Sequence, residues 1–151
     1  MILRELVEAN HVLFLDEVES WEDSIRASCR TLVADGTVTE GYAEEIIRSV
    51  NTHGPYIVLI PGIAMPHAMR NSPDATRTGL AFMKLAKPVS FDPEDPEKDA
   101  SVFFTLAAVD EAAHLENMQK LFQTLSDEEL CAELLNVSSP AELLRLDEKY
   151  S

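Results

Sequence analysis

One histidine in this sequence has an unusual local context. The segment IVLIPGIAMPHAMR (residues 57–70) runs from four apolar residues through a Pro-Gly pair and a second proline to His67. Met65 precedes a proline and is biased to an extended conformation, Pro66 has a fixed φ, and Gly62 permits a turn that other residues resist. These constraints predict a stiff loop just past a strand end. Catalytic and binding residues of α/β domains are often found in such loops. An imidazole there can act as a nucleophile or a metal ligand; a surface histidine without function is the alternative.

His114 is the second candidate, and two interpretations of it stay open. It stands near the start of a predicted helix that follows a predicted strand over residues 101–109. Its spacing to Met118 and Leu121 places it on the apolar face of that helix, which is typical of a core histidine. In the other interpretation, two strands end side by side and bring His67 and His114 together.

The remaining histidines give weaker signals. His53 ends a predicted helix, where a cation interacts favourably with the helix dipole, and His11 opens a strand. A zinc site built from His53, His67 and His114 is a further alternative. The chain has no H-E-x-x-H motif and no cysteine cluster to support such a site.

Strands and helices alternate along the chain. The patterns predict strands over residues 11–15, 56–60, 78–91 and 101–109, and helices from Ser20 to Gly36, from about residue 39 to 52, and in three pieces after residue 111. Residues 69–77 are too rich in turn formers to be regular, and the acidic segment 91–99 predicts a solvated loop. The interleaved order favours an α/β fold: one domain over residues 1–151, a sandwich with a mixed central β-sheet flanked by helices.

The charge excludes some classes of partner. A formal net charge of −15 argues against nucleic acid or an anionic membrane, because both repel such a surface, whereas a basic protein would be attracted to it. No apolar run approaches the roughly 18 residues that span a bilayer, and no signal-peptide pattern opens the chain. Cys29 and Cys131 lie far apart in apolar helical patterns. They are expected to be free thiols in a cytoplasmic protein.

The histidine segment resembles a known motif. PGIAMPHA is similar to the phosphorylation-site motif Gly-x-Ala-x-Pro-His of the IIA components of the bacterial phosphoenolpyruvate-dependent sugar phosphotransferase system, in the mannitol/fructose-type family. The longer stretch HGPYIVLIPGIAMPHA is closest to the ascorbate-type branch, which has a Gly-Pro-Tyr segment ahead of the histidine. The resemblance extends to SWEDSIRASCRTLVADGTVTEGYAEEII, TLAAVDEAAHL and SPAELLRL. One departure is Asn51, which stands where mannitol-type members carry an arginine of an arginine-glutamate pair.

The resemblance implies roles for two histidines. His67 would be the nucleophile that accepts a phosphoryl group from the histidine phosphocarrier protein, and His114 would donate a hydrogen bond to a phosphoryl oxygen. Backbone N–H groups around Ala68 are expected to help. The group would pass to a cysteine of a IIB component, and the membrane component IIC would use it during uptake of ascorbate or a related carbohydrate. No metal or organic cofactor is required. The alternative is a regulatory phosphoprotein of the nitrogen type that feeds no transporter.

Overall fold

The protein is built on a mixed β-sheet. The computed structural model describes residues 2–68 and 72–151, and within them a five-stranded sheet has the order β1-β4-β5-β3-β2. The strands are β1 (Val12–Leu15), β2 (Val58–Ile60), β3 (Gly62–Ala64), β4 (Gly79–Ser90) and β5 (Asp99–Ala107). β1 runs parallel to β4 and β3 runs parallel to β5, whereas the β4–β5 and β2–β3 pairs are antiparallel.

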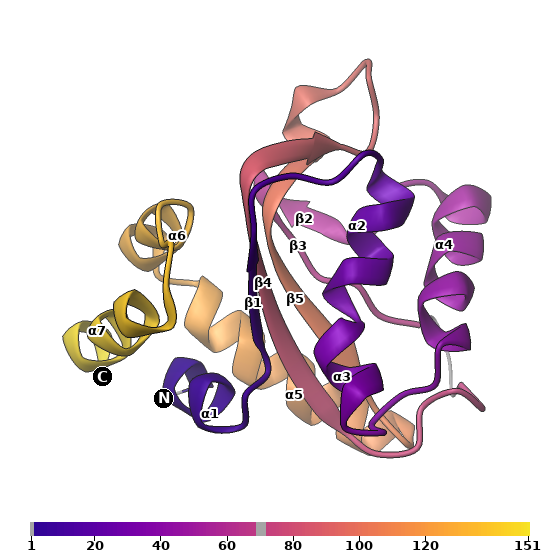
Figure 1. Cartoon of the computed structure of the whole chain (residues 1–151), viewed down its shortest axis with the longest axis horizontal. Coiled ribbons are helices and arrows are strands. Elements are labelled where there is room, and N and C mark those ends of the chain that lie inside the picture. The colour runs from indigo at the N-terminus through magenta and orange to yellow at the C-terminus, as the bar shows by residue number, and fades with distance from the viewer. Residues whose placement is uncertain (1, 69–71) are drawn as a thin grey trace.

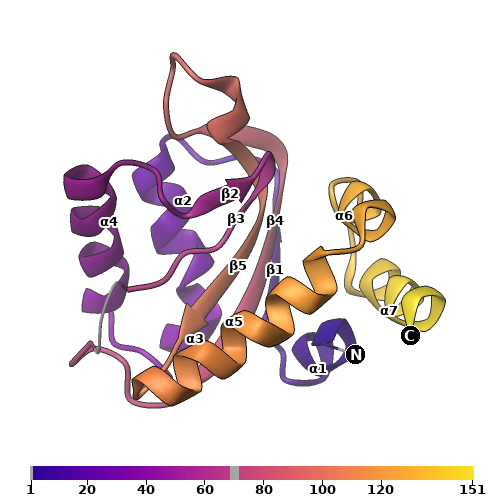
Figure 2. The same ribbon diagram turned by 180° about the vertical axis from the view of Figure 1, so that it is seen from behind.

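Helices cover both faces of this sheet. On one side lie α2 (Trp21–Ser28), α3 (Arg30–Ala34) and α4 (Gly41–His53) (Figure 1). On the other side lie α1 (Ile2–Glu8), α5 (Glu111–Leu125), α6 (Glu128–Leu134) and α7 (Pro140–Tyr150), with α5 running across the sheet (Figure 2). A short 3₁₀ turn, η1 (Pro96–Lys98), sits in the acidic loop between β4 and β5. The arrangement confirms the predicted α/β sandwich with a mixed sheet flanked by helices.

Each face of the sheet has its own core. Successive side chains of a strand point to opposite faces, so Phe103 of β5 packs with α2–α4 while Phe104 packs with α1 and α5–α7. The ring centroids of Phe104 and Phe82 of β4 lie 5.3 Å apart, nearly perpendicular to each other. Because both faces of β5 are buried, its sequence DASVFFTLA does not alternate between apolar and polar residues.

The segment before His67 differs from the prediction. Residues 62–64 were expected to belong to an irregular loop, but they form β3, between β2 and β5. Pro61 and Gly62 make the reversal from β2 to β3, and Gly62 has a φ of +89°, which favours glycine. The apolar side chains of Ile63 and Ala64 are buried, one on each face, and this burial stabilises the short strand.

Other boundaries are close to those predicted. The helix expected from Ser20 to Gly36 is divided at Cys29, whose N–H is shared between the carbonyls of Ile25 and Arg26. The helix α1 was not predicted. The stop at Gly36 is confirmed by its φ of +80°. Part of the irregular segment 69–77 lies outside the described residues. The thiols of Cys29 and Cys131 are free, as predicted. Within residues 2–68 and 72–151, no helix is both long and apolar enough to cross a membrane.

Candidate active site

The chain leaving β3 is fixed on both sides by backbone hydrogen bonds. The N–H of Met65 donates to the Ile57 carbonyl at 2.8 Å, and the carbonyl of Pro66 accepts from the N–H of Leu106 at 2.9 Å. Met65 is fully buried. Because proline has no N–H, Pro66 uses its carbonyl alone to join the end of β5. The predicted stiff segment just past a strand end is therefore confirmed, and it carries His67.

The imidazole of His67 is held in one orientation. Its Nδ1 lies 2.6 Å from the carbonyl oxygen of Met65. A carbonyl can only accept a hydrogen bond, so Nδ1 carries the proton and donates it. In the neutral ring this leaves the lone pair on Nε2. Nε2 is therefore the ring nitrogen of His67 whose lone pair is available for bonding.

The surroundings of His67 favour the neutral ring. Burial lowers the pKa of His67 below 6.5, and the nearby ring of His114 lowers it further, while the hydrogen bond to Met65 acts in the opposite direction. Because the pKa is lowered, Nε2 of His67 takes up a proton at a lower pH than the imidazole of an exposed histidine does. At neutral pH the lone pair is free for attack on an electrophile.

His114 lies beside His67. The two ring centroids are 5.4 Å apart, with an interplanar angle of 36°. β3 and β5 are parallel neighbours, so the segments that follow them, one with His67 and one leading to α5, emerge at the same end of the sheet. The side chain of Asp110 caps α5 by accepting from the N–H of Ala113 at 2.8 Å, which fixes the first turn that carries His114. Of the two interpretations left open for His114, the one in which two strand ends bring it beside His67 is confirmed, and His114 is half-buried instead of lying in the core.

The hydroxyls of two tyrosines also bond to this loop, and neither contact was predicted. The hydroxyl of Tyr42, on α4, donates to the Leu106 carbonyl at 2.6 Å and accepts from the N–H of Ala68 at 3.2 Å. Ala68 was expected to offer this N–H to a phosphoryl group, but Tyr42 already engages it. The hydroxyl of Tyr56 donates to the carbonyl of His67 at 2.8 Å. In the sequence Tyr42 shows only the apolar spacing of a helix. Tyr56 stands in the Gly-Pro-Tyr segment, which carried a resemblance but did not indicate a contact with His67.

The other two histidines lie elsewhere. His53 is exposed in the last turn of α4, the position expected for a helix-terminal cation. His11 pairs through Nε2 with a carboxylate oxygen of Asp35 at 2.5 Å, a contact that links β1 to the end of α3. Among residues 2–68 and 72–151 no group of three or more His, Cys, Asp or Glu side chains is placed to hold a metal ion. The alternative zinc site from His53, His67 and His114 is therefore not formed.

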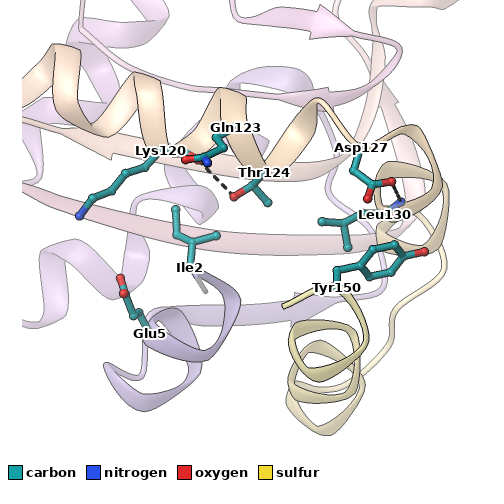
Figure 3. A pocket seen from close by; sticks show the side chains of 8 residues that line it. All are labelled: Ile2, Glu5, Lys120, Gln123, Thr124, Asp127, Leu130 and Tyr150. Atoms are coloured by element: carbon teal, nitrogen blue, oxygen red, sulfur yellow. Dashed lines mark hydrogen bonds between the residues drawn. The ribbon is translucent and has the colours of Figure 1, made fainter.

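A cavity of about 500 Å³ lies away from these histidines, between α1, α5, α6 and α7. Lys120 and Glu5 stand at one end of it, and Asp127, Leu130 and Tyr150 at the other (Figure 3). No histidine lines it, and the side chain of Asp127 is engaged in capping α6. The cavity therefore contains neither of the two histidines that lie side by side at the end of the sheet.

Comparison with known proteins agrees with the geometry. The model of the family described as phosphoenolpyruvate-dependent sugar phosphotransferase system, EIIA 2, matches residues 5–149. A relative named ascorbate-specific PTS system EIIA component, from Shigella boydii serotype 4 (strain Sb227), is 37% identical over 131 residues, which are 85% of this chain and 84% of the relative.

Two solved structures extend the comparison. The mannitol-specific cryptic phosphotransferase enzyme IIA CmtB from Escherichia coli has a TM-score of 0.85 and 29% identity, covering 99% of each chain. A structure of the complex of mannitol enzyme IIA with phosphorylated enzyme IIB, also from Escherichia coli, matches the fold with a TM-score of 0.77 and 24% identity, covering 91% of this chain and 94% of that one.

These findings confirm the resemblance drawn from PGIAMPHA, together with the phosphocarrier function and the phosphotransferase class that it implied. The chain therefore belongs to the EIIA 2 family of the phosphoenolpyruvate-dependent sugar phosphotransferase system.

Proposed function

We propose that residues 1–151 form one IIA domain in which Nε2 of His67 accepts a phosphoryl group from the histidine phosphocarrier protein and passes it to a cysteine of a IIB component. The observation that carries this proposal is the hydrogen bond from Nδ1 to the Met65 carbonyl, because it leaves the lone pair on Nε2. The stiff support of the loop suits in-line transfer, which depends mainly on alignment and charge stabilisation.

The bonds and charges of the proposed phosphoryl transfer balance without a cofactor. The lone pair of Nε2 forms a bond to phosphorus while the bond from phosphorus to the donor's histidine nitrogen breaks, and that electron pair returns to the donor ring. The His67 ring keeps its proton on Nδ1 and becomes positively charged. The Met65 carbonyl, 2.6 Å from Nδ1, stabilises this charge. In the onward step a IIB thiolate attacks the same phosphorus, and the ring leaves as the neutral imidazole.

His114 is placed to assist this transfer. Its ring lies beside that of His67 in the first turn of α5, so a phosphoryl group on Nε2 comes within its reach. A ring N–H of His114 then donates to a phosphoryl oxygen and stabilises the charge that develops there. Its neighbours Val109 and Leu115 are exposed apolar residues, which suit a surface that two partners use in turn.

The relatives support the proposed acceptor and the proposed sugar. The relatives at 33–37% identity are named ascorbate-specific, and the chain shares with that branch the Gly-Pro-Tyr segment at residues 54–56. The solved complex of a IIA with a phosphorylated IIB supports a IIB component as the acceptor. The membrane component IIC is the indirect partner. We therefore favour a role in uptake of ascorbate or a related carbohydrate over a regulatory role of the nitrogen type.

The assignment of His67 is tested by replacement. His67→Gln keeps a polar side chain of similar size but has no ring nitrogen to phosphorylate, so it should accept no phosphoryl group. The protein is incubated with phosphoenolpyruvate, enzyme I and the histidine phosphocarrier protein, and the labelled residue is mapped. His53→Gln, at the exposed end of α4, is the control and should be labelled as the wild type is. Full labelling of the His67 variant would refute the assignment.

A role of His114 in transfer predicts two linked effects. His114→Gln should slow acceptance by roughly 10²-fold or more, the scale for loss of one transition-state donor. Since the charge of His114 lowers the pKa of His67, the same variant should move that pKa upward towards 6.5, measured by NMR titration of the His67 ring. Glu116→Gln, exposed on the same helix, is the control for α5. A normal transfer rate with a lowered melting temperature would assign His114 a structural role only.

The proposed sugar is tested by the onward step. Phosphorylated protein from a single stock is offered to an ascorbate-type IIB and to a mannitol-type IIB, and the loss of label is followed over time. We expect discharge to the ascorbate-type IIB to be faster by about tenfold or more, equivalent to about 1.4 kcal/mol of discrimination. Equal rates would leave the phosphocarrier role intact but remove the support for ascorbate.

A further inference from the structure

Tyr56 contacts His67 in two ways. Its ring packs against the imidazole with the centroids 5.3 Å apart and the planes at 86°, an edge-to-face arrangement. Its hydroxyl donates to the backbone carbonyl of the same His67 at 2.8 Å. One side chain therefore restrains both the ring and the backbone of a single residue.

The turn after α4 places this tyrosine. Gly54 ends α4 with φ +81° and ψ −176°, a conformation nearly restricted to glycine, and its N–H donates to the Val50 carbonyl. The N–H of Tyr56 donates to the Gly54 carbonyl at 2.8 Å, and that of Val58 donates to the Pro55 carbonyl as the chain enters β2. The Gly-Pro-Tyr segment thus forms a rigid corner that directs the tyrosine towards the histidine.

Three groups contact the imidazole of His67, each at a different place on the ring. The Met65 carbonyl holds Nδ1, His114 lies against one part of the ring, and Tyr56 lies against another. Without the ring of Tyr56, the imidazole can rotate about its χ angles away from Met65. Either ring nitrogen can then carry the proton, and Nε2 is no longer held as the free nucleophile.

We propose that Tyr56 is a positioning residue for phosphoryl acceptance: its ring holds the His67 imidazole on the Met65 carbonyl, and its hydroxyl holds the His67 backbone. Tyr56 acts through His67 and not on the phosphoryl group itself. The inference rests on the proposed role of His67 as the acceptor. It gives the Gly-Pro-Tyr segment a physical function in addition to marking a branch of the family.

Two variants separate the ring from the hydroxyl. Tyr56→Leu removes the ring and should slow acceptance by about 10- to 100-fold, the scale expected when a reacting group loses its alignment. The loss should fall on kcat, with KM for the phosphocarrier nearly unchanged. Tyr56→Phe keeps the ring and should retain a rate within about threefold of the wild type, because the hydrogen bonds of its hydroxyl with the His67 carbonyl and Ser49 are each of modest net strength.

The decisive readout is the tautomer of His67 in the unphosphorylated protein, seen in the ¹⁵N shifts of its ring nitrogens. Wild type and Tyr56→Phe should show a protonated Nδ1 and a bare Nε2, whereas Tyr56→Leu should show both nitrogens averaged between the two forms. Tyr150→Phe, which loses a hydroxyl bonded to Glu133 far from the site, is the matched control and should match the wild type.

The inference is overturned if Tyr56→Leu transfers at the wild-type rate, or if it slows transfer with the wild-type tautomer and a raised KM, since that pattern marks a docking contact. Failure of the proposed function looks different. In that case the wild-type protein itself would carry its label on a residue other than His67, whatever the tautomer spectra show.

Discussion

The hydrogen bond from Nδ1 of His67 to the carbonyl of Met65 is the interaction on which the site depends. It leaves the free lone pair on Nε2, and in the proposed transfer it would stabilise the positive charge of the phosphorylated ring. The bond joins residues only two apart, so the backbone between them must hold a fixed shape. Pro66 supplies that shape, because its φ is fixed and its carbonyl is bonded to the end of β5. The two prolines and the glycine of the segment therefore fix the backbone that orients the imidazole of His67.

The topology of the sheet brings His114 to His67. β3 and β5 are parallel neighbours, so the loop after one and the helix after the other begin at the same edge. That is how residues 47 positions apart in sequence come within 5.4 Å, ring centroid to ring centroid. Burial then lowers the pKa of His67, which favours the uncharged imidazole near neutral pH. Geometry and electrostatics act in the same direction, since both leave Nε2 free.

The sequence was informative where chemistry and local backbone rules coincide. His67 could be selected as a candidate site residue because prolines and glycine constrain its neighbours directly. His114 could be selected because it lies near the start of a helix that follows a strand. β3 could not be predicted, since three residues are too few to show a period. The roles of Tyr42 and Tyr56 could not be predicted for another reason. Their hydroxyls bond backbone groups that are distant in sequence, and only the folded chain brings those groups within reach.

The central claim is that Nε2 of His67 carries the phosphoryl group while Nδ1 stays bonded to Met65. It is tested most directly by NMR on protein labelled with ¹⁵N at histidine and phosphorylated through the histidine phosphocarrier protein. Long-range proton–nitrogen correlations, together with phosphorus–nitrogen coupling, identify the nitrogen that is bound. We predict phosphorus on Nε2 and a proton retained on Nδ1 of His67. Phosphorus found on Nδ1 would contradict the account, because that nitrogen would first have to break its bond to the Met65 carbonyl.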